Sequence, residues 1–193
     1  SDSIKKEQEQ DRQEYEKNIE LMKEKYENAI KRIDDELSFL FHNIDSKKPI
    51  NLQDSATKIN QKQFVQFPFK EVVLPNNIKI IEDQAFKDCS LLTNITIPSS
   101  VTTIDSEVFS RCSSLKQITI PSSVKSIGSY VFSECSSLTQ ITIPSSITQI
   151  SDCSFSECSS LTQVTIPSSV KSIGDCAFYE CKSLKQITIP SSI

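Results

Sequence analysis

The 193-residue sequence is poor in the residues that most catalytic and metal-binding sites need. It has two glycines, one histidine, one methionine and no tryptophan. Two glycines cannot form a glycine-rich phosphate-binding loop, and one histidine cannot supply a multi-histidine metal site. The many serines have no base in the sequence pattern that would activate them as nucleophiles. The sequence therefore predicts a protein that is not an enzyme and that carries no metal or other cofactor.

Long apolar runs and a surplus of positive charge are also missing. No segment approaches the roughly 20 apolar residues that span a bilayer, so no membrane span is predicted. The formal net charge is −4, which argues against a nucleic-acid partner. The first ten residues, SDSIKKEQEQ, lack the apolar core of a signal peptide. This favours a cytoplasmic protein, with the cell surface as the alternative.

The composition changes along the chain. Residues 1–74 carry 13 Lys and Arg and 15 Asp and Glu, whereas residues 75–193 carry only 8 and 10. Such a change indicates a domain boundary. We predict a long helix and coiled coil over residues 1–45, a linker and N-terminal cap over 46–68, and a second domain over 69–193.

The N-terminal segment has the pattern of an amphipathic helix. Residues 1–48 contain no proline or glycine, and apolar residues recur at spacings of three and four. These residues are Ile19, Met22, Tyr26, Ile30, Ile33, Leu37, Phe41 and Ile44. The spacing fits an 11-residue period, or heptads with one four-residue insertion, and both are typical of coiled coils. We predict that self-association covers this stripe; a partner helix and docking on the second domain are the alternatives.

The second domain consists of a 23-residue repeat. Proline, phenylalanine, cysteine and leucine each recur at this spacing. A half-repeat begins at Phe69, five full repeats run from Pro75 to Ile189, and a sixth begins at Pro190. Each repeat holds an alternating segment such as Ile118-Thr-Ile120, which predicts a short strand with its isoleucines on one face. One repeat cannot bury its own apolar residues, but a stack of copies can, so the sequence predicts a solenoid.

The repeat resembles the BspA-like leucine-rich repeats. The segments SLTQITIPSSITQISDCSFSEC and SLKQITIPSSVKSIGSYVFSEC match the pattern L-x-x-I-x-I-P-x-x-V-x-x-I-G-x-x-A-F-x-x-C at nearly every fixed position. The resemblance implies a leucine-rich repeat solenoid with a parallel β-sheet on the concave face and irregular or short elements on the convex face. It also implies a non-catalytic scaffold for protein interaction, with a BspA-like cell-surface adhesin as one hypothesis. The glycine of the pattern is present only as Gly128 and Gly174.

Seven cysteines fall into two groups. Five of them recur every 23 residues, at Cys89, Cys112, Cys135, Cys158 and Cys181. This spacing is unlike that of zinc ligands, so we predict buried packing residues. Cys153 and Cys176 form a second column one repeat apart, where they could bridge in an oxidising setting.

The outward side chains of the predicted strands are one candidate protein-binding surface. Solenoids bind partners on such extended faces, although polar side chains also serve simply to keep a sheet soluble. The candidate residues are Gln117, Thr119, Gln140, Thr142, Gln163 and Thr165.

The segment from Lys62 to Phe67 is a second candidate. Lys62, Val65 and Phe67 resemble the basic-x-Val-x-Phe motif by which regulatory subunits dock on type-1 protein phosphatases, with one extra residue after the lysine. An extended Val-x-Phe segment would add to a sheet edge of the catalytic subunit. Alternatively, Phe64 and Phe67 cap the open edge of the first coil.

These candidates lead to a set of expected partners. We predict binding to other proteins, with a type-1 phosphatase catalytic subunit as the partner under the docking hypothesis. We also predict a homodimer, formed through the helix or through the uncovered edge of a C-terminal strand at residues 184–189.

Overall fold

The computed structural model describes residues 12–13, 16–28 and 56–193. The chain divides into two compact units, Ser1–Ile44 and Asp45–Ile193. In the first unit, residues 12–13 and 16–28 are helical, and Arg12 pairs with Glu16 at 3.0 Å. Residues 1–11, 14–15 and 29–45 of the predicted helix, and residues 46–55 of the predicted linker, lie outside the described residues. The structure therefore shows a helix over 16–28, and the coiled coil stays a prediction.

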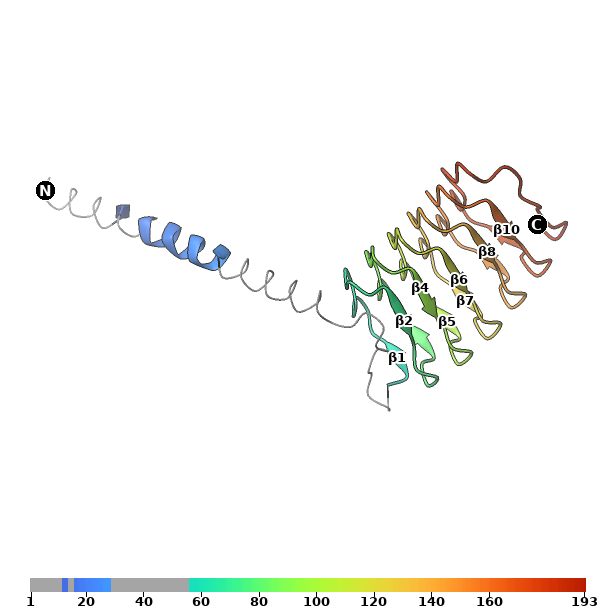
Figure 1. The fold of residues 1–193 in the computed structure, drawn as a ribbon, viewed down its shortest axis with the longest axis horizontal. Helices are drawn as coiled ribbons and strands as arrows, with labels where there is room; N and C mark the ends of the chain where they lie inside the picture. The colour runs from blue at the N-terminus through green and yellow to red at the C-terminus, as the bar shows by residue number, and fades with distance from the viewer. Residues whose placement is uncertain (1–11, 14–15, 29–55) are drawn as a thin grey trace, which may run out of the picture. The chain divides into compact units, whose positions relative to one another are not determined.

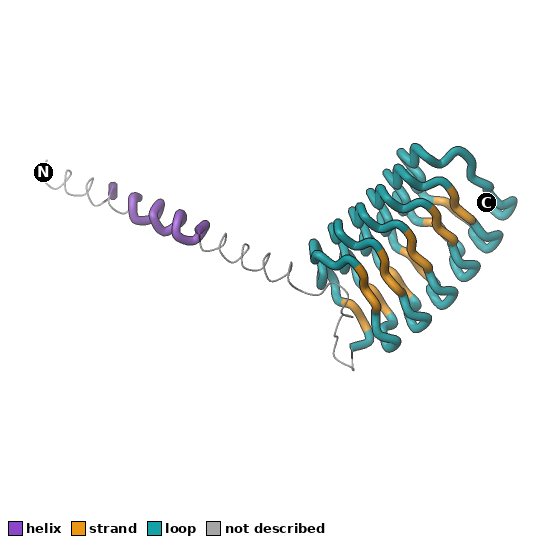
Figure 2. The backbone as a smooth tube through the Cα atoms, in the orientation of Figure 1, coloured by secondary structure: helices purple, strands orange, loops and turns teal. Residues whose placement is uncertain are grey.

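The second unit is a β-solenoid of about five turns (Figure 1). Each coil from β2 to β11 contributes a three-residue strand to one column and a two-residue strand to another, and β1 precedes them in the second column. The first column holds β2 (Glu71–Val73), β4 (Asn94–Thr96), β6 (Gln117–Thr119), β8 (Gln140–Thr142) and β10 (Gln163–Thr165). The second holds β1 (Lys58–Ile59), β3 (Ile80–Ile81), β5 (Thr103–Ile104), β7 (Ser126–Ile127), β9 (Gln149–Ile150) and β11 (Ser172–Ile173). Loops and turns complete each coil (Figure 2).

The three-residue strands have the predicted alternation. In β6, Ile118 is buried and its two neighbours are exposed, and the same pattern recurs in β2, β4, β8 and β10. Every strand pair is parallel, and Gln117 pairs with Asn94 as Thr119 pairs with Thr96. Equivalent residues of successive repeats therefore lie on one another, which confirms the predicted parallel solenoid.

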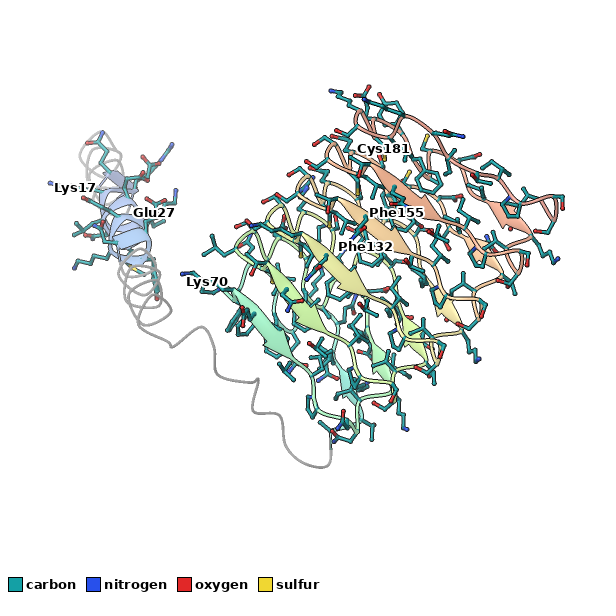
Figure 3. All side chains as sticks on the ribbon, turned by 45° about the vertical axis from the view of Figure 1, so that its right-hand side comes forward. Lys17, Glu27, Lys70, Phe132, Phe155 and Cys181 are labelled. Atoms are coloured by element: carbon teal, nitrogen blue, oxygen red, sulfur yellow. The ribbon has the colours of Figure 1, made fainter. Side chains whose placement is uncertain are left out.

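Stacked phenylalanines form the centre of the core. The rings of Phe86, Phe109, Phe132, Phe155 and Phe178 have centroids 5.4–5.7 Å apart and interplanar angles of 5–11°. Figure 3 labels Phe132 and Phe155 on neighbouring coils. We call the side of each coil that carries these rings and the following cysteines, residues 84–90 and their equivalents, the turn side. We call the side that carries the two strand columns the strand side.

The stack of coils begins before residue 69. Ile59 of β1 pairs with Ile81, and the Phe64 ring stacks on Phe86 at 5.3 Å. The Phe64 N–H donates to the Ala85 carbonyl at 2.8 Å. The strand pair and the ring stack have an offset of 22 residues instead of 23, which is why the repeat period alone does not reveal them.

The turn side holds two columns of residues in the left-handed backbone region, and none of them is glycine. They are Gln84, Glu107, Tyr130, Cys153 and Cys176 in one column and Asp88, Arg111, Glu134, Glu157 and Glu180 in the other, with φ of 51–60°. The two glycines serve close packing instead. A Cβ on Gly128 would lie 2.5 Å from the Ser106 backbone nitrogen, and one on Gly174 would lie 2.6 Å from that of Asp152.

The strand side is interrupted between the coil of β6 and β7 and the coil of β8 and β9, which we call the mid-solenoid interface. Its strands form four separate ladders, β1-β3-β5-β7, β9-β11, β2-β4-β6 and β8-β10. Elsewhere the N–H of the residue after the second strand donates to the preceding coil, as Gly174 does to Ile150 at 2.8 Å. At this interface the Ser151 hydroxyl donates to the Ile127 carbonyl at 2.7 Å instead. The parallel sheet predicted for the three-residue strands is therefore divided into two shorter ladders, β2-β4-β6 and β8-β10.

The predicted strand at residues 184–189 is not formed. Residues 182–193 carry no strand, and no ladder joins residues 186–188 to β10. Leu184 and Ile187 pack against the core while partly exposed, because a neighbouring coil covers them from one side only. The apolar positions of this segment were predicted correctly, whereas its strand conformation was not.

Candidate binding surface

Six predicted site residues lie together on one face of the solenoid, which we call the Gln/Thr face. All of them are exposed: Gln117, Thr119, Gln140, Thr142, Gln163 and Thr165. Gln163 pairs with Gln140 and Thr165 with Thr142, so the amides and the hydroxyls form two parallel columns. A hollow of about 300 Å³ lies over β6 and β8, where the ladder is interrupted. The face therefore offers uncharged donors and acceptors on two blocks of strands, one that ends at β6 and one formed by β8 and β10.

The carboxylates of residues 75–193 lie on one side of each coil. All ten acidic residues of 75–193 fall between the second strand and the repeat cysteine: Glu82, Asp83, Asp88, Asp105, Glu107, Glu134, Asp152, Glu157, Asp175 and Glu180. Basic residues occur on both sides, since Lys87 and Lys182 pair with Glu107 and Glu180 on the turn side. Other lysines precede strands, as Lys116 precedes β6 and Lys125 precedes β7. Beside β4, β6, β8 and β10, the Gln/Thr face therefore has lysines and no carboxylates, whereas Glu71 of β2 occupies the position equivalent to Asn94.

The turn side carries a shallow groove that the sequence analysis missed. Its volume is about 530 Å³, and its lining includes Asp88, Arg111, Glu134, Glu157 and Glu180. Arg111 lies between Glu134, at 3.0 Å, and Asp88, at 3.9 Å. The Glu134 carboxylate raises the pKa of this guanidinium. The arginine balances part of the acidic column, and the 23-residue spacing of charged residues before each cysteine was the signal for it.

The segment from Lys62 to Phe67 follows the turns of the next coil. Lys62 and Gln66 have φ of 55° and 60°, and the Gln66 N–H donates to the Lys87 carbonyl at 2.9 Å. The Phe67 ring stacks on Phe69 at 5.1 Å, and Val65 is half-buried. This arrangement has the form of the capping alternative. Docking through an extended Val-x-Phe segment would require it to leave the stack, and that function stays a prediction.

The five repeat cysteines are packing residues, as predicted. Cys89, Cys112, Cys135 and Cys158 are buried, and Cys181 is half-buried. Each thiol donates to a phenylalanine carbonyl of the preceding coil, as Cys112 does to Phe86 at 3.2 Å. Burial raises the pKa of Cys89 to about 12 and that of Cys112 and Cys135 well above its usual range. These thiols therefore stay protonated near neutral pH.

The described part of the chain offers few other kinds of site. It contains no group of three or more His, Cys, Asp or Glu side chains arranged to hold a metal ion. Within the same residues, no helix combines the length and apolar character needed to cross a membrane.

The comparison with protein families agrees with the coil geometry. Residues 13–139 and 125–193 match the family described as BspA type Leucine rich repeat region (6 copies). The chain belongs to this family. The resemblance drawn from the 23-residue pattern is thus confirmed. No curated protein matches the chain.

Solved structures of BspA-type solenoids are similar to this chain. A leucine rich cell surface protein from Faecalibacterium prausnitzii A2-165 is 40% identical, with a TM-score of 0.63 over 72% of this chain and 37% of that one. A leucine-rich repeat protein from Bacteroides ovatus is 31% identical, with a TM-score of 0.58 over 72% and 42%. The T. pallidum leucine-rich repeat protein is 26% identical, with a TM-score of 0.57 over 70% and 76%. The chain spans about two fifths of the first two proteins.

Proposed function

We propose that this BspA-type chain is a non-catalytic interaction module that binds a protein partner on the Gln/Thr face. The observation that carries the proposal is the two registered columns of exposed, uncharged side chains. Repeat solenoids commonly bind through extended surfaces of this kind.

The chemistry of the face suits a protein surface. Each glutamine amide both donates and accepts hydrogen bonds, and each threonine hydroxyl does the same. The backbone beneath them is held by ladders such as Gln163 to Gln140, so little ordering is needed when a partner binds. Lysines beside the face, such as Lys116, favour a partner that is neutral or acidic at the point of contact.

A charge-reversal experiment tests this face. In one variant, Gln117, Gln140 and Gln163 are all changed to Glu, which keeps side-chain size and places three like charges on the face. In the matched control, Ser126, Gln149 and Ser172 of the second strand column are changed to Glu. Proteins crosslinked to the intact chain in extracts of its source cells are compared by mass spectrometry. We expect the main partner to be lost with the face variant and kept with the control; equal recovery with both would contradict the proposal.

Display on the cell surface is a second candidate function. It is favoured by the 40% identity to the F. prausnitzii protein, which is described as a leucine rich cell surface protein. In this case the Gln/Thr face would act in adhesion. Brief protease treatment of intact source cells should then degrade the solenoid, so that its band disappears from an immunoblot. An unchanged band would contradict display on the cell surface.

Self-association through the helix is a further part of the proposal. Ile19, Met22 and Tyr26 form one stripe and are 38%, 56% and 66% exposed. A stripe of this kind is covered when helices associate. Light scattering at micromolar concentration should show a dimer, and Met22→Glu should shift it to monomer. A monomer for the unchanged chain would exclude both this route and the C-terminal edge.

A further inference from the structure

Two cysteines lie outside the column of the other five. Cys176 is exposed and Cys153 is half-buried. Neither occupies the column in which a thiol donates to a phenylalanine carbonyl. They stand instead in a left-handed column of the turn side, with φ of 51° at Cys153 and 55° at Cys176. Reagents in solution can reach this pair, whereas the buried repeat thiols are shielded.

The backbone fixes these two cysteines in register. The Cys153 N–H donates to the Asp175 carbonyl at 2.9 Å. The Asp152 carboxylate accepts from the Asp175 N–H at 2.9 Å, one residue before each cysteine. On this side of the solenoid, equivalent phenylalanine rings of successive coils lie 5.4–5.7 Å apart, which indicates the rise from one coil to the next. This spacing falls inside the range of about 4.4–6.8 Å that disulfide-bonded Cα atoms require.

The left-handed column of the turn side also includes a tyrosine. Tyr130 occupies the equivalent position one coil before Cys153, with φ of 58°. A hydrogen bond with the Cys153 side chain raises the pKa of the Tyr130 hydroxyl. Tyr130, Cys153 and Cys176 thus occupy one position of three successive coils.

We propose that Cys153 and Cys176 are a redox-active pair. They form a disulfide between the coil of β8 and β9 and the coil of β10 and β11. The oxidant is a small-molecule disulfide such as oxidised glutathione. The Cys176 thiolate attacks one sulfur of the oxidant, forms a mixed disulfide and releases one glutathione thiolate. The Cys153 thiolate then attacks the Cys176 sulfur and releases the second glutathione. The two protein thiols lose two protons and two electrons, and the oxidant takes them up as two thiols.

The bond would join two coils whose strands, β8 and β10, carry part of the Gln/Thr face. Phe178 and Leu184, which follow β11, pack against the core but are not fully buried. A covalent link from Cys176 to Cys153 would oppose separation of this coil from Phe155 and the coil below it. Oxidation would therefore hold the C-terminal end of the Gln/Thr face in place, which adds a regulated element to a binding module.

The experiment uses the full chain and oxidised glutathione. After oxidation, free thiols are alkylated, and the digest is analysed by mass spectrometry without reduction. We expect one intrachain crosslink between the peptides of Cys153 and Cys176, with the five repeat cysteines alkylated after unfolding. In Cys153→Ser, Cys176 should instead retain one glutathione.

A second pair tests whether the column geometry is the cause. The double variant Tyr130→Cys with Cys176→Ser moves the pair one coil toward the N-terminus and should bridge 130 to Cys153 under the same conditions. Glutathione left on Cys176 of the unchanged chain, crosslinks between chains, or a bridge that includes Cys181 would each overturn the proposal.

Discussion

The two sides of the solenoid behave differently at the mid-solenoid interface. On the turn side, the Phe132 N–H donates to the Ser154 carbonyl at 2.9 Å, and the Phe132 and Phe155 rings stack at 5.5 Å. On the strand side, β6 is not bonded to β8 and β7 is not bonded to β9. The coils are thus joined continuously along the phenylalanine and cysteine columns and only in blocks along the strands.

The difference has consequences for side chains near the interruption. Ile127 is partly exposed, whereas its equivalents Ile104 and Ile150 are buried. The buried hydroxyls of Ser123 and Ser146 have no hydrogen-bond partner, whereas Ser169 in the same column donates to the Ile147 carbonyl at 2.8 Å. Near-identical repeats therefore do not make identical contacts. Where the strands are not bonded, the hydrogen bonds and ring stack of the turn side hold the two coils together.

Alkaline pH should weaken the turn side most. The pKa of each buried repeat thiol is raised in the folded chain, so the unfolded chain loses these protons first as pH rises. Stability then falls above the unfolded pKa of about 8.5, by about 2 kcal/mol per thiol at pH 10 and roughly 8 kcal/mol for the four buried thiols. Urea unfolding with a reductant present, at pH 8 and pH 10, measures the loss.

A cysteine variant isolates this effect from the ionisation of lysine and tyrosine. Cys135→Ala removes one thiol of the column, so its stability should fall less steeply with pH than that of the unchanged chain. Identical slopes for the two chains would show that the buried thiols do not cause the alkaline loss.

Removal of one phenylalanine ring from the turn side should have the next largest effect on stability. Phe132→Ala leaves a cavity between Phe109 and Phe155 and should lower the free energy of unfolding by about 3–5 kcal/mol. The strand-side control Ile141→Val should cost only about 1 kcal/mol. Equal losses in urea unfolding would mean that the two sides contribute alike.

A matched pair of serines should sharpen the comparison. Ser146→Ala removes a buried hydroxyl that has no partner and should stabilise the fold by about 1 kcal/mol. Ser169→Ala removes a hydroxyl that donates to the Ile147 carbonyl and should destabilise it by about 1 kcal/mol. Thermal unfolding of both variants decides the point, because destabilisation by Ser146→Ala as well as by Ser169→Ala would show that the Ser146 hydroxyl has a partner.

Introducing at residue 151 the glycine that equivalent positions carry as Gly128 and Gly174 should give the smallest change in stability. Ser151→Gly removes the hydroxyl that donates to Ile127, and leaves that carbonyl for the N–H of residue 151. The added flexibility of glycine offsets much of the gain, so the net effect should be within about 0.5 kcal/mol. Hydrogen exchange is the sharper readout, since the amide of residue 151 should become protected. Unchanged exchange would mean that Ser151 does not cause the interruption.

Much of this fold could be predicted from the repeat because each feature of it recurs at one period. Ile118 is buried between exposed neighbours as the strand alternation requires, and the phenylalanine and cysteine columns follow from their 23-residue spacing. The first layer was predicted as a cap and not as a further coil, because Phe64 stacks at an offset of 22. The left-handed columns escaped because residues such as Tyr130 and Glu134 occupy positions where glycine would signal the conformation.

The candidate site was predictable to a lesser degree. Strand alternation was enough to place Gln140 and Thr142 on the surface, and the structure brings them together with the other residues of the face. The one-sided placement of the carboxylates was not recognised, because Glu134 and Lys116 separate only when the coil is closed in three dimensions. Glutamine and threonine make hydrogen bonds with many kinds of group, so their pattern does not identify the partner.

The phenylalanine stack also has a geometric consequence for the coil. Because the rings are nearly parallel, their centroid spacing of 5.4–5.7 Å measures the rise from one coil to the next at that point. Paired strands rise by only about 4.8 Å. Each coil is therefore a wedge, thicker at the aromatic column than at its paired strands. Successive wedges bend the stack toward the strands, so the paired strands line the inner side of the bend.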